Sequence, residues 1–313
     1  LKGAVLAHTV YPEAWCRTRG DLDLLVARAE RSRSADIMRS LGYRDGGLTA
    51  GHWVMQQDLW ERPLTGSLPH LVDVHVELSN RAFLSARMPA DACLARAVPA
   101  SVCGDGAWQL DPVDALIFSC VHRVGHHPRD ARLVWSFDLV QQAAGLGAGD
   151  VDLLLTRATD MGLASICAHE LRAAADVWGV SSGASVPEVI EALAHAGRAE
   201  AARAFLTPDR GRIRDFWLDV KALPGWRAIE FERNGSRLLA MQVRPADDDG
   251  EDGWYALLDL AAAEDPEMGE VPVRRVHRAD GRRFLGWISP TLLVFEHAPG
   301  SAARDTVDLA TLR

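Results

Sequence analysis

Residues 17–26 read RTRGDLDLLV, a segment in which two aspartates interrupt an otherwise apolar strand. Side chains two positions apart on a strand project from the same face, so Asp21 and Asp23 lie about 6–7 Å apart along the backbone. Aspartate is disfavoured in strands, and neighbouring carboxylates repel each other unless a cation lies between them. The pattern therefore predicts a cation site at the start of this strand, where Gly20 leaves room for a ligand.

A second strand is predicted over residues 71–78, which read LVDVHVEL. Its alternation places Asp73 and His75 on one face. Three carboxylates from two neighbouring strands suit a pair of hard cations, Mg²⁺ or Mn²⁺, and two such ions about 3.5–4 Å apart activate an attacking oxygen and neutralise a leaving phosphate. We interpret His75 as a hydrogen-bond partner of these carboxylates or a buried histidine rather than as a metal ligand. The alternative for the aspartates is an exposed edge strand with solvated acids.

Basic residues near this motif are candidate phosphate ligands. Lys2 and Gly3 are predicted at a strand-to-helix turn, where backbone N–H groups favour phosphate. Arg17 and Arg19 flank the aspartates and can clamp a triphosphate through bidentate bonds. His122 and His126 share one helical face, but the glutamate of an H-E-x-x-H zinc motif is missing, so we interpret them as structural.

The sequence changes character twice along the chain. Helices and strands alternate over the first hundred residues, with a helix at 3–15, a doubly buried strand at 22–27, a helix at 29–41 and strands at 52–60 and 71–78. Amphipathic helices are then expected at 111–127, 132–144, 151–161, 164–177, 186–202 and 213–223. Short alternating runs follow at 228–233, 237–244, 254–260, 271–277, 283–288 and 292–297. The prediction is an α+β protein with a mixed sheet and helices at 1–108, a helical domain at 109–226 and an antiparallel β module at 227–313.

Composition excludes several classes of protein. The 313 residues are 48% hydrophobic and 25% charged, which is typical of a folded soluble chain. A net charge of −9 argues against binding of a polynucleotide over a broad surface, and no apolar stretch is long enough to span a membrane. The five cysteines are scattered without a C-x-x-C pair, which favours reduced thiols and a cytoplasmic location. No export leader opens the chain, and because Leu1 rather than Met stands first we expect a fragment that lacks its natural start.

Taken together, these motifs resemble a known family. The segments LKG at 1–3, RTRGDLDLLV at 17–26 and VDVH at 72–75 are similar to the uncharacterised bacterial nucleotidyltransferase family of the DNA polymerase β-like superfamily. The resemblance covers residues 1–226 and leaves the β module without a recognised counterpart. Two departures are visible, because Ala4 stands where the superfamily has Ser or Gly and Val76 stands where the family tends to have Trp.

The resemblance implies transfer of a nucleoside monophosphate from a nucleoside triphosphate such as ATP, with release of pyrophosphate and two Mg²⁺ or Mn²⁺ ions. It assigns Asp21, Asp23 and Asp73 as metal ligands. It also implies that Lys2 and Gly3 form the phosphate turn, and that Arg17, Gly20 and His75 belong to the binding motif. The acceptor is a hydroxyl of a small molecule, a peptide or a protein.

Two other functions keep the same fold. A nucleotide-binding or protein-interaction module without catalysis is the first alternative, and the missing serine after Gly3 favours it. A phosphohydrolase would use the same carboxylates with a water nucleophile. It is the weakest reading, because only His75 lies near the aspartates in the sequence.

Overall fold

The computed structural model describes residues 1–46, 57–65, 68–127, 132–179 and 186–207, two short pieces at 218–219 and 221–222, and seven strands between 227 and 308. The chain divides into two compact units. The first comprises residues 1–48 and 55–208, and the second comprises residues 49–54 and 209–313. The motifs of interest all belong to the first unit.

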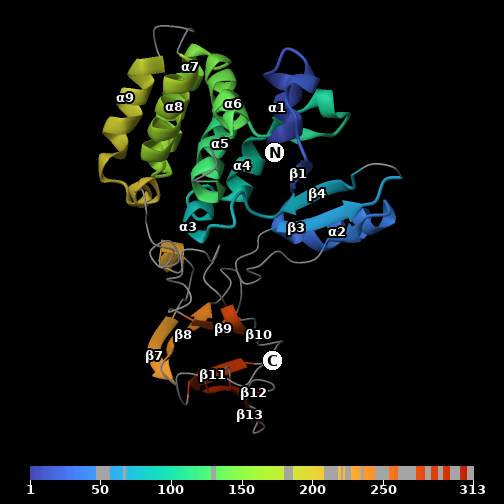
Figure 1. Cartoon of the computed structure of the whole chain (residues 1–313), viewed down its shortest axis with the longest axis vertical. Coiled ribbons are helices and arrows are strands. Elements are labelled where there is room, and N and C mark those ends of the chain that lie inside the picture. The colour runs from blue at the N-terminus through green and yellow to red at the C-terminus, as the bar shows by residue number, and fades with distance from the viewer. Residues whose placement is uncertain are drawn as a thin grey trace. The chain divides into compact units, whose positions relative to one another are not determined.

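A four-stranded mixed sheet forms the N-terminal part of the first unit (Figure 1). Strand β1 (Asp21–Leu25) pairs in parallel with β4 (His70–His75). Strand β3 (Gln57–Arg62) is antiparallel to β4, and β2 (Arg44–Asp45) is antiparallel to β3. The resulting order β1-β4-β3-β2, together with the helices that follow, confirms the predicted α+β class.

One face of this sheet packs against helix α2 (Arg31–Ser40). Its core joins Met38 of the helix to Trp60, Val72 and Val74 of the sheet, with Leu22 packed alongside. Because strand side chains alternate between faces, burying Leu22 and Val72 here turns Asp21, Asp23 and Asp73 to the opposite face. The apolar alternation of the sequence therefore determines on which side of the sheet the acidic residues lie.

Strand β1 differs from the prediction of a strand buried on both faces. It lies at the edge of the sheet, where only β4 pairs with it, and Leu24 is 38% exposed. A run of apolar residues does not distinguish a central strand from an edge strand, which explains the error. The strand predicted at 52–60 is described from Gln57 onward, and its first residues lie outside the described part of the chain.

The first helix is shorter than predicted. Helix α1 covers Gly3–Thr9, and a 3-10 turn at Ala14–Cys16 follows. Pro12 lacks a backbone N–H and disfavours helical geometry at the residue before it, so the helix ends early. Gly3 begins the helix with φ of +33°, a value that residues with a side chain rarely adopt. The backbone nitrogen of Leu1 donates to the carbonyl of Asp23 at 2.8 Å, which holds this end beside β1.

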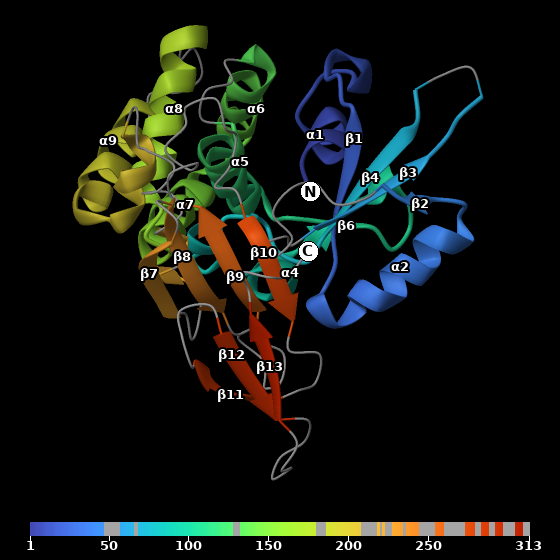
Figure 2. The same ribbon diagram turned by 60° about the horizontal axis from the view of Figure 1, so that its bottom comes forward.

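A helical block completes the first unit (Figure 2). Its central helix α5 (Pro112–His126) packs against three others. The elements from residue 82 onward are α3 (Ala82–Ser85), α4 (Ala90–Arg96), β5 (Val98–Pro99), β6 (Trp108–Gln109), α5, α6 (Leu133–Ala144), α7 (Ala148–Asp160), α8 (Ala164–Trp178) and α9 (Val186–Ala196). The helix expected at 186–202 ends at Ala196 and continues as 3-10 turns at Gly197–Ala199 and Ala201–Leu206. The helix expected at 213–223 lies largely outside the described residues, among which no helix is both long and apolar enough to cross a bilayer.

Asp111 caps α5, as its Asp-Pro sequence predicts. Its carboxylate accepts bonds from the backbone nitrogens of Val113 and Asp114 at 3.0 and 3.2 Å. Arg157 of α7 donates to the same carboxylate at 2.6 Å, so one side chain both begins α5 and ties it to a neighbouring helix.

We expect Asp111→Ala to lower the free energy of unfolding by about 1–2 kcal/mol, the range typical of a lost helix cap. Urea unfolding followed by circular dichroism measures this change. Asp36→Ala is the control, because Asp36 is 79% exposed and, among the described residues, pairs with Arg39 one turn away. Equal stability of the two variants would contradict the capping role.

The second unit contains the antiparallel β module that the sequence predicts. Four strands pair in the order β10-β9-β8-β7, and three pair in the order β11-β12-β13. Their bounds are β7 (Arg227–Arg233), β8 (Ser236–Val243), β9 (Trp254–Asp259), β10 (Val273–Arg278), β11 (Arg283–Trp287), β12 (Leu292–Glu296) and β13 (Arg304–Asp308). The last strand was not predicted, because its sequence RDTVD carries only one apolar residue.

Candidate metal site

Two aspartates and a histidine converge on the face of the sheet opposite α2. Asp23 of β1 and Asp73 of β4 are direct neighbours across the parallel pairing, and His75 lies two residues further along β4. One ligand atom from each of Asp23, Asp73 and His75 lies within 4.8 Å of the others. The sequence motif therefore does bring carboxylates from two strands together.

Asp23 is the most enclosed of these groups, with 4% of its surface exposed. Its Oδ1 lies 3.3 Å from Nε2 of His75 and 3.4 Å from Nζ of Lys2. Burial by itself raises the pKa of this carboxyl, but the bond from His75 and the charge of Lys2 outweigh burial and lower it. Asp23 is thus held as a carboxylate at neutral pH, the form that binds cations.

The carboxylate of Asp73 has one unpaired oxygen among the described residues. Its Oδ1 is buried and has no hydrogen-bond partner among the described residues. Burial raises the pKa of Asp73, and the charges of Asp23 and Asp21 raise it further. An unpartnered buried acceptor is costly, and a divalent cation shared with Asp23 would remove both the orphaned oxygen and the repulsion. Carboxylate oxygens and an imidazole nitrogen are both ligand types that bind divalent metal ions in proteins.

Asp21 and Gly20 lie at the start of β1. Asp21 is half-buried and shares its strand face with Asp23, although its carboxylate is outside the group of three atoms within 4.8 Å. Its charge still raises the pKa of Asp73, so the two side chains interact. Gly20 is exposed, and a Cβ placed there would meet nothing within 4 Å. This end of the strand has space for a ligand.

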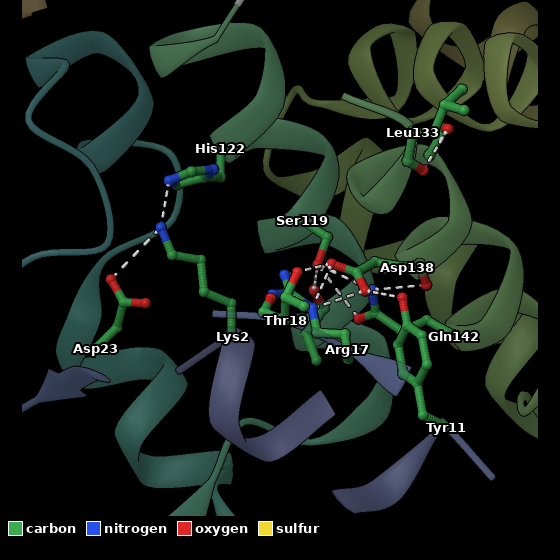
Figure 3. A network of polar contacts seen from close by, with 12 residues as sticks. Lys2, Tyr11, Arg17, Thr18, Asp23, Ser119, His122, Leu133, Asp138 and Gln142 are labelled. Carbon is green, nitrogen blue, oxygen red and sulfur yellow. Dashed lines mark hydrogen bonds and ion pairs between the residues drawn. The ribbon is translucent and has the colours of Figure 1, made fainter. Parts of the chain in front are cut away.

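The guanidinium of Arg17 forms an ion pair with the carboxylate of Asp138. Its Nη2 donates to Oδ2 of Asp138 on α6 at 2.7 Å, and its Nε donates to Oδ1 at 3.1 Å (Figure 3). The hydroxyl of Tyr11 donates to the same Oδ1 at 2.6 Å. Binding of a triphosphate by Arg17 stays a prediction, because its guanidinium is engaged by this buried carboxylate. Sequence reasoning missed the pairing, and the available signal was an aspartate within a largely apolar helix.

Lys2 also has a partner that the sequence did not reveal. Its Nζ lies 2.6 Å from Nε2 of His122 on α5, so its ammonium bridges His122 and Asp23 (Figure 3). His126, one turn further along α5, instead contacts Oγ of Ser79 at 3.0 Å. Burial lowers the pKa of His122 well below its usual value, and the charge of Lys2 lowers it further. The helical histidines therefore pack as expected, and one of them reaches the candidate site.

A comparison with protein families places these residues in context. The model of a family described as an uncharacterised nucleotidyltransferase matches residues 1–179, which include the sheet, the converging acidic residues and helices up to α8. Neither the curated proteins nor the solved structures contain a significant match to the chain. The β module lies outside the matched segment.

Proposed function

The protein belongs to this family of uncharacterised nucleotidyltransferases, since the match covers more than half of its 313 residues. From that premise we propose that it transfers a nucleoside monophosphate from a nucleoside triphosphate to a hydroxyl group, with divalent cations bound at the sheet. The observation that supports the proposal most directly is the convergence of Asp23, Asp73 and His75, together with the orphaned Oδ1 of Asp73.

Three carboxylates hold the cations in this proposal. Asp23 and Asp73 provide the ligand atoms that converge, and Asp21 extends the set along β1. Divalent cations held by these residues, Mg²⁺ or Mn²⁺, would neutralise charge on the phosphates and would lower the pKa of the acceptor hydroxyl. His75 donates from Nε2 to Oδ1 of Asp23 and so orients that carboxylate.

In this proposal, side chains of the protein accept the proton of the acceptor hydroxyl and contact the phosphates. Asp73 accepts the proton of the acceptor hydroxyl, whose oxygen forms a bond to the α-phosphorus while the α–β anhydride bond breaks and pyrophosphate leaves. The Lys2 ammonium carries three N–H groups, so it can contact Asp23 and His122 and still donate to a phosphate oxygen. Gly20 leaves space for the nucleotide, and Arg17 fixes the segment before β1 through Asp138.

The net charge of the protein limits the chemical class of the acceptor. A net charge of −9 disfavours a polyanionic acceptor, which leaves a hydroxyl of a small molecule, a peptide or a protein.

Two labelled nucleotides test the proposal. The purified chain is incubated with Mg²⁺ or Mn²⁺, candidate acceptors and a nucleoside triphosphate labelled at the α- or the γ-phosphorus. We expect the α label to move to an acceptor while the γ label appears in pyrophosphate. Release of the γ label as inorganic phosphate would indicate a phosphohydrolase. Metal-dependent binding without movement of either label would indicate a catalytically silent module, and both results would overturn the proposal.

A further inference from the structure

The ammonium group of Lys2 contacts two side chains, His122 and Asp23, which compete for it. It lies 2.6 Å from Nε2 of His122 and 3.4 Å from Oδ1 of Asp23. A charge-assisted hydrogen bond is usually about 2.7–2.9 Å long, so the contact with His122 is a full bond and the contact with Asp23 is a looser ion pair. The lysine is therefore held nearer to the helix than to the carboxylate.

His122 is well placed to hold that ammonium. Its ring is half-buried, lies edge-on to Phe118 at 5.8 Å and stacks on His126 at 5.2 Å. Packing on both sides limits rotation of the imidazole. Burial and the neighbouring lysine lower the pKa of His122, so the ring is neutral at physiological pH. A neutral imidazole offers one acceptor nitrogen, and the contact identifies it as Nε2.

We propose that His122 is a positioning residue that retains the Lys2 ammonium on α5 and so keeps the Asp23 carboxylate available to a divalent cation. The inference rests on the proposed function, since it concerns the same metal site. It extends that function by assigning a role to a helical residue 120 positions away from Lys2 in the sequence.

The physical basis is competition for one carboxylate. Asp23 is 4% exposed, and an ammonium in contact with a poorly solvated carboxylate is attracted strongly. Without an acceptor on α5, Lys2 would shorten its 3.4 Å contact with Oδ1 of Asp23. A divalent cation would then have to displace the lysine before it could bind. Loss of one charged hydrogen bond corresponds to at least about a tenfold change in affinity.

Substitutions at His122 distinguish the effect of its acceptor nitrogen from the effect of its aromatic ring. His122→Phe keeps an aromatic ring but removes Nε2, and we expect the dissociation constant for Mn²⁺ to rise about tenfold. His122→Gln carries an acceptor oxygen near the position of Nε2, so we expect affinity close to that of the unmodified protein. Isothermal titration of the full chain with Mn²⁺ alone measures both values. Thermal unfolding checks that each variant is folded.

A matched control and a double variant test the role of Lys2. His126→Phe removes a neighbouring imidazole that contacts Ser79 instead of Lys2, and we expect Mn²⁺ affinity to be unchanged. In a Lys2→Met background, His122→Phe should have no further effect, because no ammonium remains to be held.

Three outcomes would overturn the inference. Equal Mn²⁺ affinity of the unmodified protein and His122→Phe would show that His122 does not protect the carboxylate. A tenfold loss that persists in the Lys2→Met background would show a general structural role. Failure of the unmodified protein to bind Mn²⁺ would remove the proposed function as well, so that result is distinct from the other two.

Discussion

Asp23→Asn is expected to abolish metal-dependent nucleotide transfer and to weaken Mn²⁺ binding by more than about 100-fold. Asparagine keeps the size of the side chain and one acceptor oxygen but removes the negative charge. Loss of a group that only supports a metal ligand typically costs about 10–100-fold in affinity, so loss of a charged ligand should exceed that range. Isothermal titration with Mn²⁺ and movement of an α-phosphorus label measure the two effects.

Asp23 is the appropriate target because it lies next to three other residues of the candidate site. It pairs with Asp73 across the strands, accepts a bond from His75 and lies beside Lys2. Asp21 and Asp73 each have fewer of these contacts. No other substitution at the sheet should therefore have a larger effect on cation binding.

Asp58→Asn is the matched control. Asp58 belongs to β3 of the same sheet, but its carboxylate pairs with Arg31 at 2.6 Å and is absent from the converging group. We expect its Mn²⁺ affinity and label transfer to equal those of the unmodified protein. Full activity of Asp23→Asn, or equal losses in the two variants, would contradict a cation site built on Asp23.

Much of the candidate site could be predicted from local sequence. A strand has a period of two residues, so the D-x-D pattern fixes Asp21 and Asp23 on one face, and the apolar Leu22 between them fixes which face meets α2. The same reasoning places Asp73 and His75 together on β4. The direct pairing of Asp23 with Asp73 depends on the register between two strands 50 residues apart, which neither strand encodes alone.

Contacts between the sheet and the helical block could not be predicted in this way. The period of a helix shows which residues share a face but not which distant element that face meets. His122 and Asp138 both lie on predicted helices, yet their partners Lys2 and Arg17 are more than 100 residues away in the sequence. The tertiary arrangement alone decides that one helix supports Lys2 and another supports Arg17.

The pair formed by Arg17 and Asp138 leads to the second large effect. We expect Asp138→Ala to lower the free energy of unfolding of the first unit by about 3–5 kcal/mol. The side chains are 7% and 5% exposed, so removal of the carboxylate leaves a buried guanidinium without its charged partner. It also removes the acceptor of the Tyr11 hydroxyl, whose pKa is raised by burial and by Asp138 so that it stays a donor. Urea unfolding monitored by helical circular dichroism measures the change.

The double variant Arg17→Met with Asp138→Leu distinguishes the cost of an unpaired charge from a general loss of packing. Replacing both members of a buried ion pair by apolar side chains of similar size is often nearly neutral, so we expect the double variant to recover most of the stability lost in Asp138→Ala. Glu191→Ala is the exposed control, because its pairing with Arg172 is at the surface and its removal should change stability by no more than about 0.5 kcal/mol. If the double variant is less stable than Asp138→Ala, the two side chains contribute through packing, and the ion pair is not what fixes Arg17 beside β1.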